Sequence, residues 1–466
     1  MKKSHQLHFV GIGGIGMSGI AEIFLSQGMK VSGSDLNRSE TTERLEKLGA
    51  KVILGHERGH VLGADVVVIS SAVKADNPEV LEAKARGIPV IPRAEMLAEI
   101  MRGKTGLAIA GTHGKTTTTS MAAQILMKAD LDPTVVVGGK VQAIGSNAKM
   151  GSGDLVVVEA DESDGSFHLL PATCAVITNV DSDHMEFYQS RENLDQAFLD
   201  FAKKLPFYGR VWVCLEDPGV RAILPGITKP CSTYGFSDQA DLVAKNLRTQ
   251  PGGRQIFDLH SREHPAGLHR MLGTITLNVL GRHNVLNALG AIGISFSAGA
   301  DFKAAKAALG EFQHVKRRFD ERYFSEGTGI RIIDDYGHHP TEVQAVLSTA
   351  RQTEPGRIIT VFQPHRYTRT RLCWKEFLSC FRDSDELILL PIYAASEEPI
   401  DGVTSEALAS AIDAAGGAGK PRVRVVKSLE EAALLVAKEV KPRDLILTLG
   451  AGSITRLPEL LIPLLS

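Results

Sequence analysis

The sequence has few cysteines and almost no net charge. Its five cysteines in 466 residues are scattered, odd in number and without C-x-x-C spacing. This pattern indicates neither a disulfide framework nor a structural zinc site, and it favours the reducing cytoplasm. The formal net charge of −2 gives no global field that would attract a polyanion. We therefore predict no nucleic-acid binding.

Long hydrophobic runs are also missing. No segment approaches the roughly 20 apolar residues that a membrane-spanning helix requires, so we predict no membrane insertion. The start "MKK" followed by an apolar run resembles a secretory signal. Its glycines argue against a targeting segment, because a phosphate-binding turn needs their backbone freedom. We expect a cytoplasmic protein that is a monomer or a weak homodimer.

A glycine-rich turn follows the first apolar segment, in "HFVGIGGIGMSGIAE". Gly11, Gly13 and Gly16 have the spacing at which a turn tightens, the backbone approaches a diphosphate and a helix packs closely on a strand. Asp35 follows at the end of the next strand-like segment, where dinucleotide-binding domains place an acid. The pattern predicts a Rossmann-like parallel sheet, and an NAD-dependent oxidoreductase is one interpretation.

A second phosphate-binding pattern is "GTHGKTTTT", residues 111–119, between the apolar segment "GLAIA" and a helical pattern. Backbone amides there would hold phosphates, and Lys115 would reach the β- and γ-phosphates. The hydroxyl of Thr116 or Thr117 would bind Mg²⁺. Ile109 stands where the standard G-x-x-x-x-G-K-[ST] loop has its first glycine. The strand–loop–helix context predicts an ATP site, which an oxidoreductase would not need.

The chain is too long for one compact core. Strand-like runs alternate with helix-like runs, and this alternation starts afresh near residues 98 and 315. We predict an α/β protein of three domains. They are an N-terminal Rossmann-like domain over 1–97, a central P-loop-type ATPase domain over 98–314 and a C-terminal Rossmann-like domain over 315–466.

Acidic residues follow the apolar strand of the central segment, in "VVVEADESD". Glu159 ends the apolar run, and either it or Asp161 could hold Mg²⁺ directly or through water. The alternative is that Asp161, Glu162 and Asp164 cap the next helix.

A second strand, "AVITNV", ends in "DSDHMEFY". His184 there lies beside Asp181 and Asp183. Because the carboxyl ends of parallel strands share one edge of a sheet, we expect His184 near Glu159 and assign it a metal role. A single histidine can also be a satisfied structural group.

Seven motifs together resemble the Mur ligases, in order and over nearly the whole chain. They are "GTHGKTTTTSM", "EADESDGSF", "TNVDSDHMEFY", "GRHNVLNALGA", "VKRRFD", "DDYGHHPTEV" and "FQPHRYTRTR". The last two resemble the family member that adds the first amino acid. The resemblance implies ATP and Mg²⁺ as cofactors, UDP-N-acetylmuramate and L-alanine as substrates, and an acyl-phosphate intermediate.

The resemblance also implies roles for individual residues. The catalytic group is Lys115, Glu159, His184 and Arg318. The Mg²⁺ ligands are Thr116, Glu159 and His184. Contacts to ATP come from Gly111, Thr112, His113, Gly114, Lys115, Thr116, Thr117, His283, Asn284, Asn287 and Asp335. Contacts to the UDP-sugar come from Gly13, Gly14, Ile15, Gly16, Asp35, His56, Ser70 and Ser71. The amino acid is held by Tyr336, His338, Arg366 and Arg369.

Simpler interpretations of some of these residues stay open. Asn284 could be an ordinary helix cap. The basic cluster that contains Arg318 could be a solvated face. Arg366 and Arg369 have the i,i+3 spacing of one side of a helical turn, and on pattern alone they could be surface residues.

Alternative functions also remain. A sister Mur ligase, or a recycling ligase that attaches a tripeptide, differs only in its amino-acid pocket. A non-enzymatic nucleotide switch would turn ATP over slowly and form no coupled product.

Overall fold

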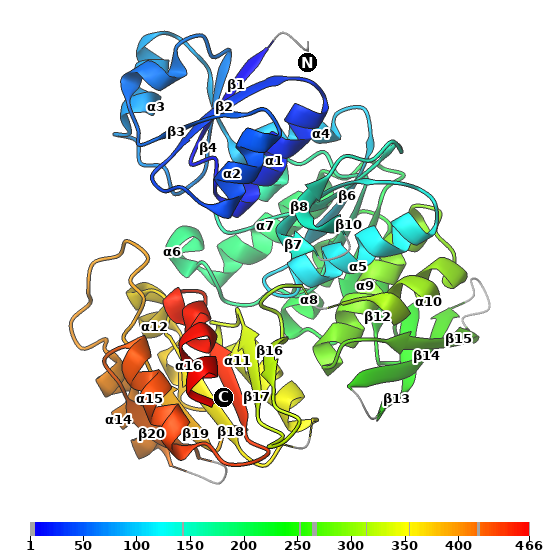
Figure 1. Ribbon diagram of the computed structural model, residues 1–466. Helices are drawn as coiled ribbons and strands as arrows, with labels where there is room; N and C mark the ends of the chain where they lie inside the picture. The colour runs from blue at the N-terminus through cyan, green and yellow to red at the C-terminus, as the bar shows by residue number, and fades with distance from the viewer. Residues whose placement is uncertain are drawn as a thin grey trace. The chain divides into compact units, whose positions relative to one another are not determined.

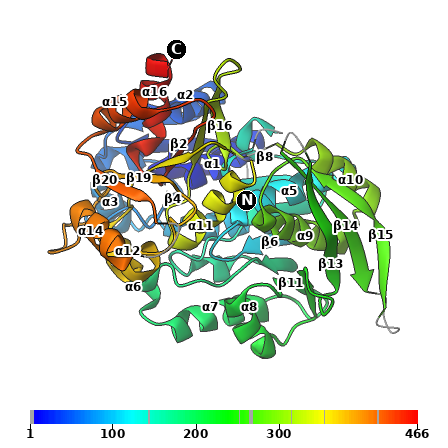
Figure 2. The ribbon, with the colours of Figure 1, turned by 90° about the horizontal axis from the view of Figure 1, so that it is seen from below.

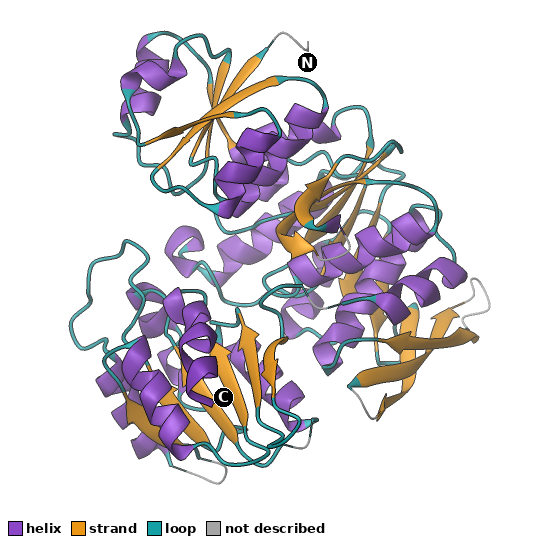
Figure 3. Cartoon of the chain, in the orientation of Figure 1, coloured by secondary structure: helices purple, strands orange, loops and turns teal. Residues whose placement is uncertain are grey.

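The computed structural model describes residues 5–141, 144–250, 253–262, 268–313, 315–353, 355–416 and 420–465. Within these ranges the strands form three sheets of five, ten and six strands, each flanked by helices (Figures 1 and 3). The three-domain α/β fold is therefore confirmed.

Contacts group the chain into two compact units. The first unit comprises Met1–Arg248, Ile256–Asn278 and Val285–Gln313, and contains the first sheet and all but a few residues of the second. The second comprises Thr249–Gln255, Val279–Asn284 and His314–Ser466, and contains the third sheet. The boundaries at residues 97 and 314 stay predictions.

The first sheet is parallel throughout, in the order β3-β2-β1-β4-β5. Its strands are β1 (Gln6–Val10), β2 (Lys30–Asp35), β3 (Lys51–Leu54), β4 (Val66–Ile69) and β5 (Val90–Pro92). Its helices are α1 (Ile15–Ser26), α2 (Glu40–Lys47), η1 (Arg58–Val61), α3 (Pro78–Ala85) and α4 (Arg93–Met101). Local capping sets the helix starts: for example, Asn77 Oδ1 accepts from Glu79 N at 2.9 Å, and Pro78 begins α3.

The second sheet has the order β15-β14-β13-β12-β11-β10-β6-β9-β7-β8. Strands from β13 to β7 pair in parallel, and β8 pairs antiparallel with β7. Its first strands are β6 (Thr105–Ala110), β7 (Thr134–Val141), β8 (Ser146–Lys149), β9 (Leu155–Glu159), β10 (Cys174–Ile177) and β11 (Arg210–Cys214). They are followed by β12 (Cys231–Gly235), β13 (Leu242–Gln250), β14 (Arg254–Arg262) and β15 (His269–Leu277). The last three strands extend one end of the sheet (Figures 1 and 2).

Helices of this region include α5 (Lys115–Lys128), η3 (Ser166–Leu169), α6 (Met185–Tyr188), α7 (Arg191–Lys203), α8 (Pro218–Ile223), η4 (Leu224–Gly226), α9 (Arg282–Ser297) and α10 (Phe302–Glu311). The central strands are buried on both faces, as continuous apolar runs in parallel sheets predict. Because the strands themselves are buried, the polar side chains of the candidate site lie at the carboxyl ends of β6, β9 and β10 and in the loops that follow them.

Helix α1 of the first sheet packs against β7 and β8 of the second. Asn147, on β8, donates from Nδ2 to the carbonyl of Ile15 and to Ser18 Oγ. Arg44 of α2 also donates to Asn147 Oδ1, at 3.1 Å, and pairs with Glu22 at 2.9 Å. These contacts join the first two sheets into one unit.

The third sheet has the order β16-β17-β21-β18-β19-β20, with only β16 antiparallel among its described strands. The strands are β16 (Asp320–Phe324), β17 (Arg331–Asp335), β18 (Ile358–Phe362), β19 (Glu386–Leu389), β20 (Arg422–Val425) and β21 (Leu445–Leu449). The helices are α11 (Pro340–Arg351), α12 (Tyr367–Leu372), α13 (Trp374–Phe377), α14 (Ser405–Ala415), α15 (Leu429–Glu439), η5 (Ser453–Arg456) and α16 (Leu457–Leu465). Among the described residues, none of the helices is both long and apolar enough to cross a membrane.

Candidate active site

The loop between β6 and α5 requires glycine at two positions. Gly111 has φ +128°, and a Cβ there would lie 2.0 Å from Thr178 Oγ1. Gly114 has φ +80° and precedes the first residue of α5, and a Cβ there would lie 2.4 Å from Asn287 Oδ1. The loop is thus pressed between the end of β10 and helix α9. This close packing fixes the backbone amides at the start of α5, where an anion would bind.

Lys115 is held at the start of α5 by its own loop and by a buried acid. Its Nζ donates to the carbonyls of Gly111 at 2.7 Å and Thr112 at 3.0 Å, and lies 2.7 Å from Glu162 Oε2. Burial disfavours the charged form, but three carboxylates outweigh this effect and raise the pKa of the Lys115 ammonium. The carboxylates are those of Glu162, Asp161 and Glu159. Lys115 is therefore a fixed positive charge.

Glu162 is 1% exposed and pairs with Lys115, so of the two interpretations left open for it, helix capping does not apply. Burial raises its pKa, and the ion pair with Lys115 opposes this effect. Its neighbours bond within the turn that leads to η3: Asp161 Oδ1 accepts from Ser163 N, and Asp164 Oδ1 accepts from Ser166 N. The N-cap of η3 is Gly165, which makes no side-chain capping bond. Residues 159–164 contain four acids, and nothing in the sequence indicates which of their side chains is buried.

Glu159 and Thr116 meet at the end of β9. Thr116 Oγ1 donates to Glu159 Oε1 at 3.0 Å, and the other carboxylate oxygen accepts from Gly138 N at 2.7 Å. His184 has φ +56° just before α6, and its Nε2 lies 3.9 Å from Glu162 Oε1. The structure thus brings the three proposed metal ligands to the same edge of the sheet.

The donor set at this edge fits Mg²⁺. Thr116 and Glu159 supply a hydroxyl and a carboxylate, the hard oxygen donors that Mg²⁺ prefers, whereas the imidazole of His184 is a softer donor. Three carboxylates lie near Lys115, and Arg93 pairs with one of them, Asp161. When all three are ionised, they exceed the two positive groups by one negative charge, which a divalent cation would offset.

Two residues that follow β10, Asn179 and Asp181, hold the phosphate loop in place through contacts to His113. Asn179 Oδ1 accepts from His113 N at 2.7 Å, and Asn179 Nδ2 donates to the carbonyl of His113 at 2.9 Å. The His113 ring lies 3.0 Å from Asp181 Oδ2. Pattern reasoning missed Asn179, although a polar residue two positions after the apolar strand β10 was a usable signal. Thr117, one position after Thr116, is buried inside α5.

The residues proposed near adenine all lie at the start of α9, where the boundary between the two compact units also falls. Asn287 lies against Gly114 in the first unit. His283 and Asn284 belong to the second, where Asn284 Nδ2 donates to the carbonyl of Leu280 and His283 packs on Gly281.

The glycine-rich turn of the first sheet lies beside Asp35. Gly13 N donates to Asp35 Oδ2 at 2.9 Å, and a Cβ on Gly13 would lie 2.9 Å from the same oxygen. Gly14 precedes Ile15, the first residue of α1. Ser70 and Ser71 directly follow β4, at the same carboxyl edge. The turn therefore has the form of a diphosphate cradle at a helix N-terminus.

His56 belongs to a buried polar cluster built around Glu79. Its Nδ1 lies 3.0 Å from Ser34 Oγ and 3.2 Å from Glu79 Oε2. Glu79 is fully buried and also contacts His60 Nδ1 at 2.7 Å and His8 Nε2 at 3.7 Å. Burial favours the neutral acid, but the nearby His8 ring and the hydrogen bonds with Ser34 and His60 prevail and lower the pKa of Glu79 to about 2. Nothing in the sequence pattern singled out Glu79.

At the third sheet, Asp335 ends β17 and is buried. Its two oxygens accept from Phe319 N at 2.6 Å and Gly337 N at 2.7 Å. Burial raises the pKa of Asp335 to about 6, and the nearby Arg318 opposes this shift. The Arg318 guanidinium also lies over the Tyr336 ring, 5.3 Å from its centroid. Arg318, Asp335 and Tyr336 thus form one cluster.

A chain of ring contacts runs along the same edge. His338 lies between Tyr336 and His365, with centroids 5.4 Å from each, and His365 stacks on Tyr393 at 5.6 Å. Arg369 is 6% exposed, and its Nη1 lies 3.1 Å from His365 Nδ1. Arg366 has φ +69° and is the N-cap of α12, where its carbonyl accepts from Thr370 N at 3.1 Å, and Arg369 lies in the first turn of that helix.

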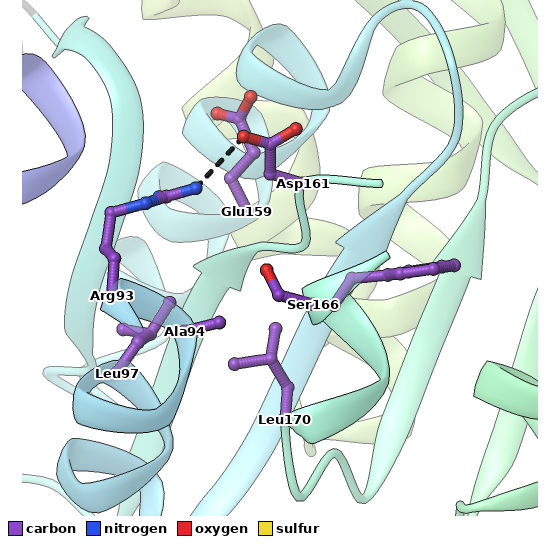
Figure 4. A pocket seen from close by; sticks show the side chains of 8 residues that line it. Arg93, Ala94, Leu97, Glu159, Asp161, Ser166 and Leu170 are labelled. Carbon is purple, nitrogen blue, oxygen red and sulfur yellow. Dashed lines mark hydrogen bonds and ion pairs between the residues drawn. The ribbon is translucent and has the colours of Figure 1, made fainter. Parts of the chain in front are cut away.

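A small open cavity lies between α4, η3 and the end of β9 (Figure 4). Arg93 points across it to Asp161, donating from Nη2 to Oδ2 at 3.0 Å, with Glu159 beside them (Figure 4). Arg93 is a further site residue that the motifs did not indicate, because it lies 68 positions from its partner.

Three family models match the chain in order. "Mur ligase family, catalytic domain" matches residues 6–105, "Mur ligase middle domain" residues 109–295 and "Mur ligase, glutamate ligase domain" residues 317–452.

Two relatives illustrate the similarity of the sequence. The UDP-N-acetylmuramate–L-alanine ligase of Anaeromyxobacter sp. (strain Fw109-5) is 52% identical, over 98% of this chain and 97% of the relative. The enzyme of the same name from Syntrophobacter fumaroxidans is 49% identical, over 99% of this chain and 96% of the relative.

Among solved structures, the UDP-N-acetylmuramate-alanine ligase of Thermotoga maritima superposes with a TM-score of 0.81 and 29% identity, covering 98% of both chains. A murein peptide ligase from Psychrobacter arcticus shares the fold with a TM-score of 0.72, covering 99% of both chains at 23% identity. The matched models cover well over half of the chain, and the relatives extend over nearly all of it. This chain therefore belongs to the Mur ligase family.

Proposed function

We propose that the protein joins L-alanine to the lactyl carboxylate of UDP-N-acetylmuramate, converting ATP to ADP and phosphate, in the synthesis of peptidoglycan precursors. One observation carries the proposal. A glycine-framed loop holds Lys115 against buried carboxylates, in a chain about half identical along its whole length to ligases of that name. An oxidoreductase has no use for this loop.

The reaction needs activation of a carboxylate, because an amine cannot displace its oxygen directly. A lactyl oxygen attacks the γ-phosphorus of ATP, and ADP leaves. The alanine amine then attacks the acyl carbon of the acyl phosphate, and the tetrahedral intermediate expels phosphate. Two anions must approach each other in the first step, so catalysis depends on positioning and charge neutralisation.

Lys115 and the amides of residues 111–117 supply the neutralisation at ATP. Thr116, Glu159 and His184 would hold Mg²⁺ at the adjoining edge of the sheet. When bound, Mg²⁺ offsets phosphate charge and polarises the transferred phosphoryl group. In this assignment the ion pair with Glu162 holds the Lys115 ammonium beside the loop, and the phosphates of ATP then compete with Glu162 for that ammonium.

The remaining assignments follow the family motifs. We assign Asp335, Arg318 and the residues 283, 284 and 287 to ATP, and Gly13–Gly16, Asp35, His56, Ser70 and Ser71 to the UDP-sugar. Tyr336, His338, Arg366 and Arg369 are assigned to the amino acid, because planar guanidinium groups bind both oxygens of an α-carboxylate. None of the five cysteines, all of which lie within the described residues, forms a disulfide, which supports a reducing, cytoplasmic location. We propose a monomer or a weak homodimer.

The test is phosphate release with UDP-N-acetylmuramate, Mg²⁺-ATP and each amino acid in turn. We expect release that requires both the sugar nucleotide and L-alanine. Release with the tripeptide but not L-alanine would establish the recycling ligase. Slow release that needs neither substrate would establish a nucleotide switch. Either result would refute the proposal.

A lysine pair provides the matched variants. Lys115→Ala should abolish turnover while leaving UDP-sugar binding largely intact. Lys128→Ala, at the other end of the same helix, removes a partly exposed lysine paired with Glu311 and should leave turnover unchanged. Normal turnover in Lys115→Ala would contradict the role of Lys115.

A further inference from the structure

Arg93 connects the glycine-rich turn to the acidic end of β9. It is the first residue of α4, and its side chain is 22% exposed. Nη2 donates to Asp161 Oδ2 at 3.0 Å (Figure 4). The same guanidinium lies against the turn, because a Cβ built on Gly16 would be 2.8 Å from Arg93 Nη1 and 3.2 Å from Cζ. One planar group therefore contacts both phosphate-binding regions of the first unit.

The glycine-rich turn has no positive side chain of its own. Residues 11–26, which form the turn and helix α1, contain no lysine or arginine. A helix N-terminus contributes only about half a positive charge, whereas a diphosphate carries at least two negative charges. Arg93 supplies a full charge beside Gly16, and its Nη1, the atom nearest the turn, is not the one bonded to Asp161.

We propose that Arg93 binds the diphosphate of the nucleotide sugar, and that Asp161 is a positioning residue for Arg93. The inference rests on the proposed function, because it takes the glycine-rich turn as the diphosphate site. Asp161 occupies one edge of the guanidinium fork and turns the other edge toward the turn. The fork has five donors, so Arg93 can keep this bond and still contact phosphate oxygens.

A purely structural role for Arg93 makes a different prediction. If the ion pair only fastened α4 to β9, removing either partner would have the same effect on UDP binding. If Arg93 binds phosphate, removal of the arginine is far more damaging than removal of the aspartate.

The experiment measures binding of UDP and of uridine by calorimetry, without ATP or Mg²⁺, to the full-length protein. Arg93→Met should weaken UDP binding about 10- to 100-fold, the range for a hydrogen bond to a charged group, and leave uridine binding unchanged. Asp161→Asn should change UDP binding only a few-fold. Arg102→Met is the matched control, because Arg102 follows the last residue of the same helix and its side chain is 77% exposed. It should bind UDP as the wild type does.

Salt dependence separates the roles again. The affinity for UDP should fall less steeply with added salt in Arg93→Met, and Arg93→Lys should recover part of the loss because it keeps the charge. Wild-type UDP affinity in Arg93→Met, or equal losses in Arg93→Met and Asp161→Asn, would overturn the inference. Should Arg93→Met fail to fold, Arg93→Gln also removes the charge and gives the same comparison, with Arg93→Lys as the variant that keeps the charge. Failure of the wild type to bind UDP or UDP-N-acetylmuramate would instead refute the proposed function, and this inference with it.

Discussion

Substituting Gly114 should impair ATP binding more than it impairs stability. Gly114 has φ +80°, a conformation that costs a residue with a Cβ about 1–2 kcal/mol. Gly103 has nearly the same φ, +77°, but a Cβ there would have nothing within 4 Å. The backbone strain alone should therefore lower the free energy of unfolding by similar amounts in Gly114→Ala and Gly103→Ala, and any further loss in Gly114→Ala comes from the contact with Asn287.

The two variants differ at Asn287. The new methyl at position 114 would lie 2.4 Å from Asn287 Oδ1, so either this amide or the loop must move by about 1 Å to reach an ordinary contact distance. A shift of that size disrupts one or two loop contacts to phosphate, and each is a hydrogen bond to a charged group. ATP should then bind about 10- to 100-fold more weakly to Gly114→Ala, and Gly103→Ala should bind normally.

Guanidinium unfolding and calorimetry with ATP measure the two effects separately. The double variant Gly114→Ala with Asn287→Ala tests the cause, because removing the amide relieves the conflict and the two losses should not add. The reasoning is refuted if Gly114→Ala binds ATP like the wild type, or if Gly103→Ala loses as much affinity.

Three further predictions concern buried charge. Lys115→Ala should lower the free energy of unfolding by about 3–5 kcal/mol, because it leaves the buried carboxylate of Glu162 without its ion-pair partner. Adding Glu162→Gln to this variant should restore part of the loss in urea unfolding, and a double variant less stable than Lys115→Ala would contradict the pairing. Glu79→Gln should lower the unfolding free energy by about 3 kcal/mol at pH 7, because a Glu79 pKa lowered from 4.5 to about 2 stabilises the fold above pH 4.5. The difference in unfolding free energy between variant and wild type should shrink as the pH falls from 4.5 toward 2, and a difference that stays constant would contradict this pKa. The pKa of Asp335 is raised from 3.8 to about 6, so its ionisation destabilises the fold as the pH rises through this interval. Between pH 4 and pH 7 the unfolding free energy of Asp335→Asn should therefore rise by about 3 kcal/mol relative to that of the wild type, and parallel pH profiles of the two proteins would disprove the raised pKa.

The sheets and the phosphate loops could be predicted because their signals are local. A glycine-rich turn after an apolar strand and before a helix, as at 8–22 and 105–128, encodes its own geometry. Residues at the ends of parallel strands, such as Glu159, could be placed together by the rule that these ends share an edge.

Other residues could not be found because their role depends on distant partners. Arg93 contacts Asp161 only because the fold packs α4 beside the end of β9. Glu79 forms its polar cluster only because the fold brings together histidines from β1, η1 and the loop after β3. Glu162 is distinguished from adjacent acids only by the direction of its side chain. The rings of His365 and Tyr393 meet across 28 positions, a separation that carries no periodic signal.

The contact between α1 and β8 has a consequence for dissecting the protein. Strand β8 ends the ten-stranded sheet, and α1 lies on it, with Asn147 bonded to the backbone of that helix. A fragment starting near residue 98 would uncover this edge strand, and exposed edges template pairing between molecules. Such a fragment should associate with itself, so the ATP-binding region is best studied with the first 97 residues attached.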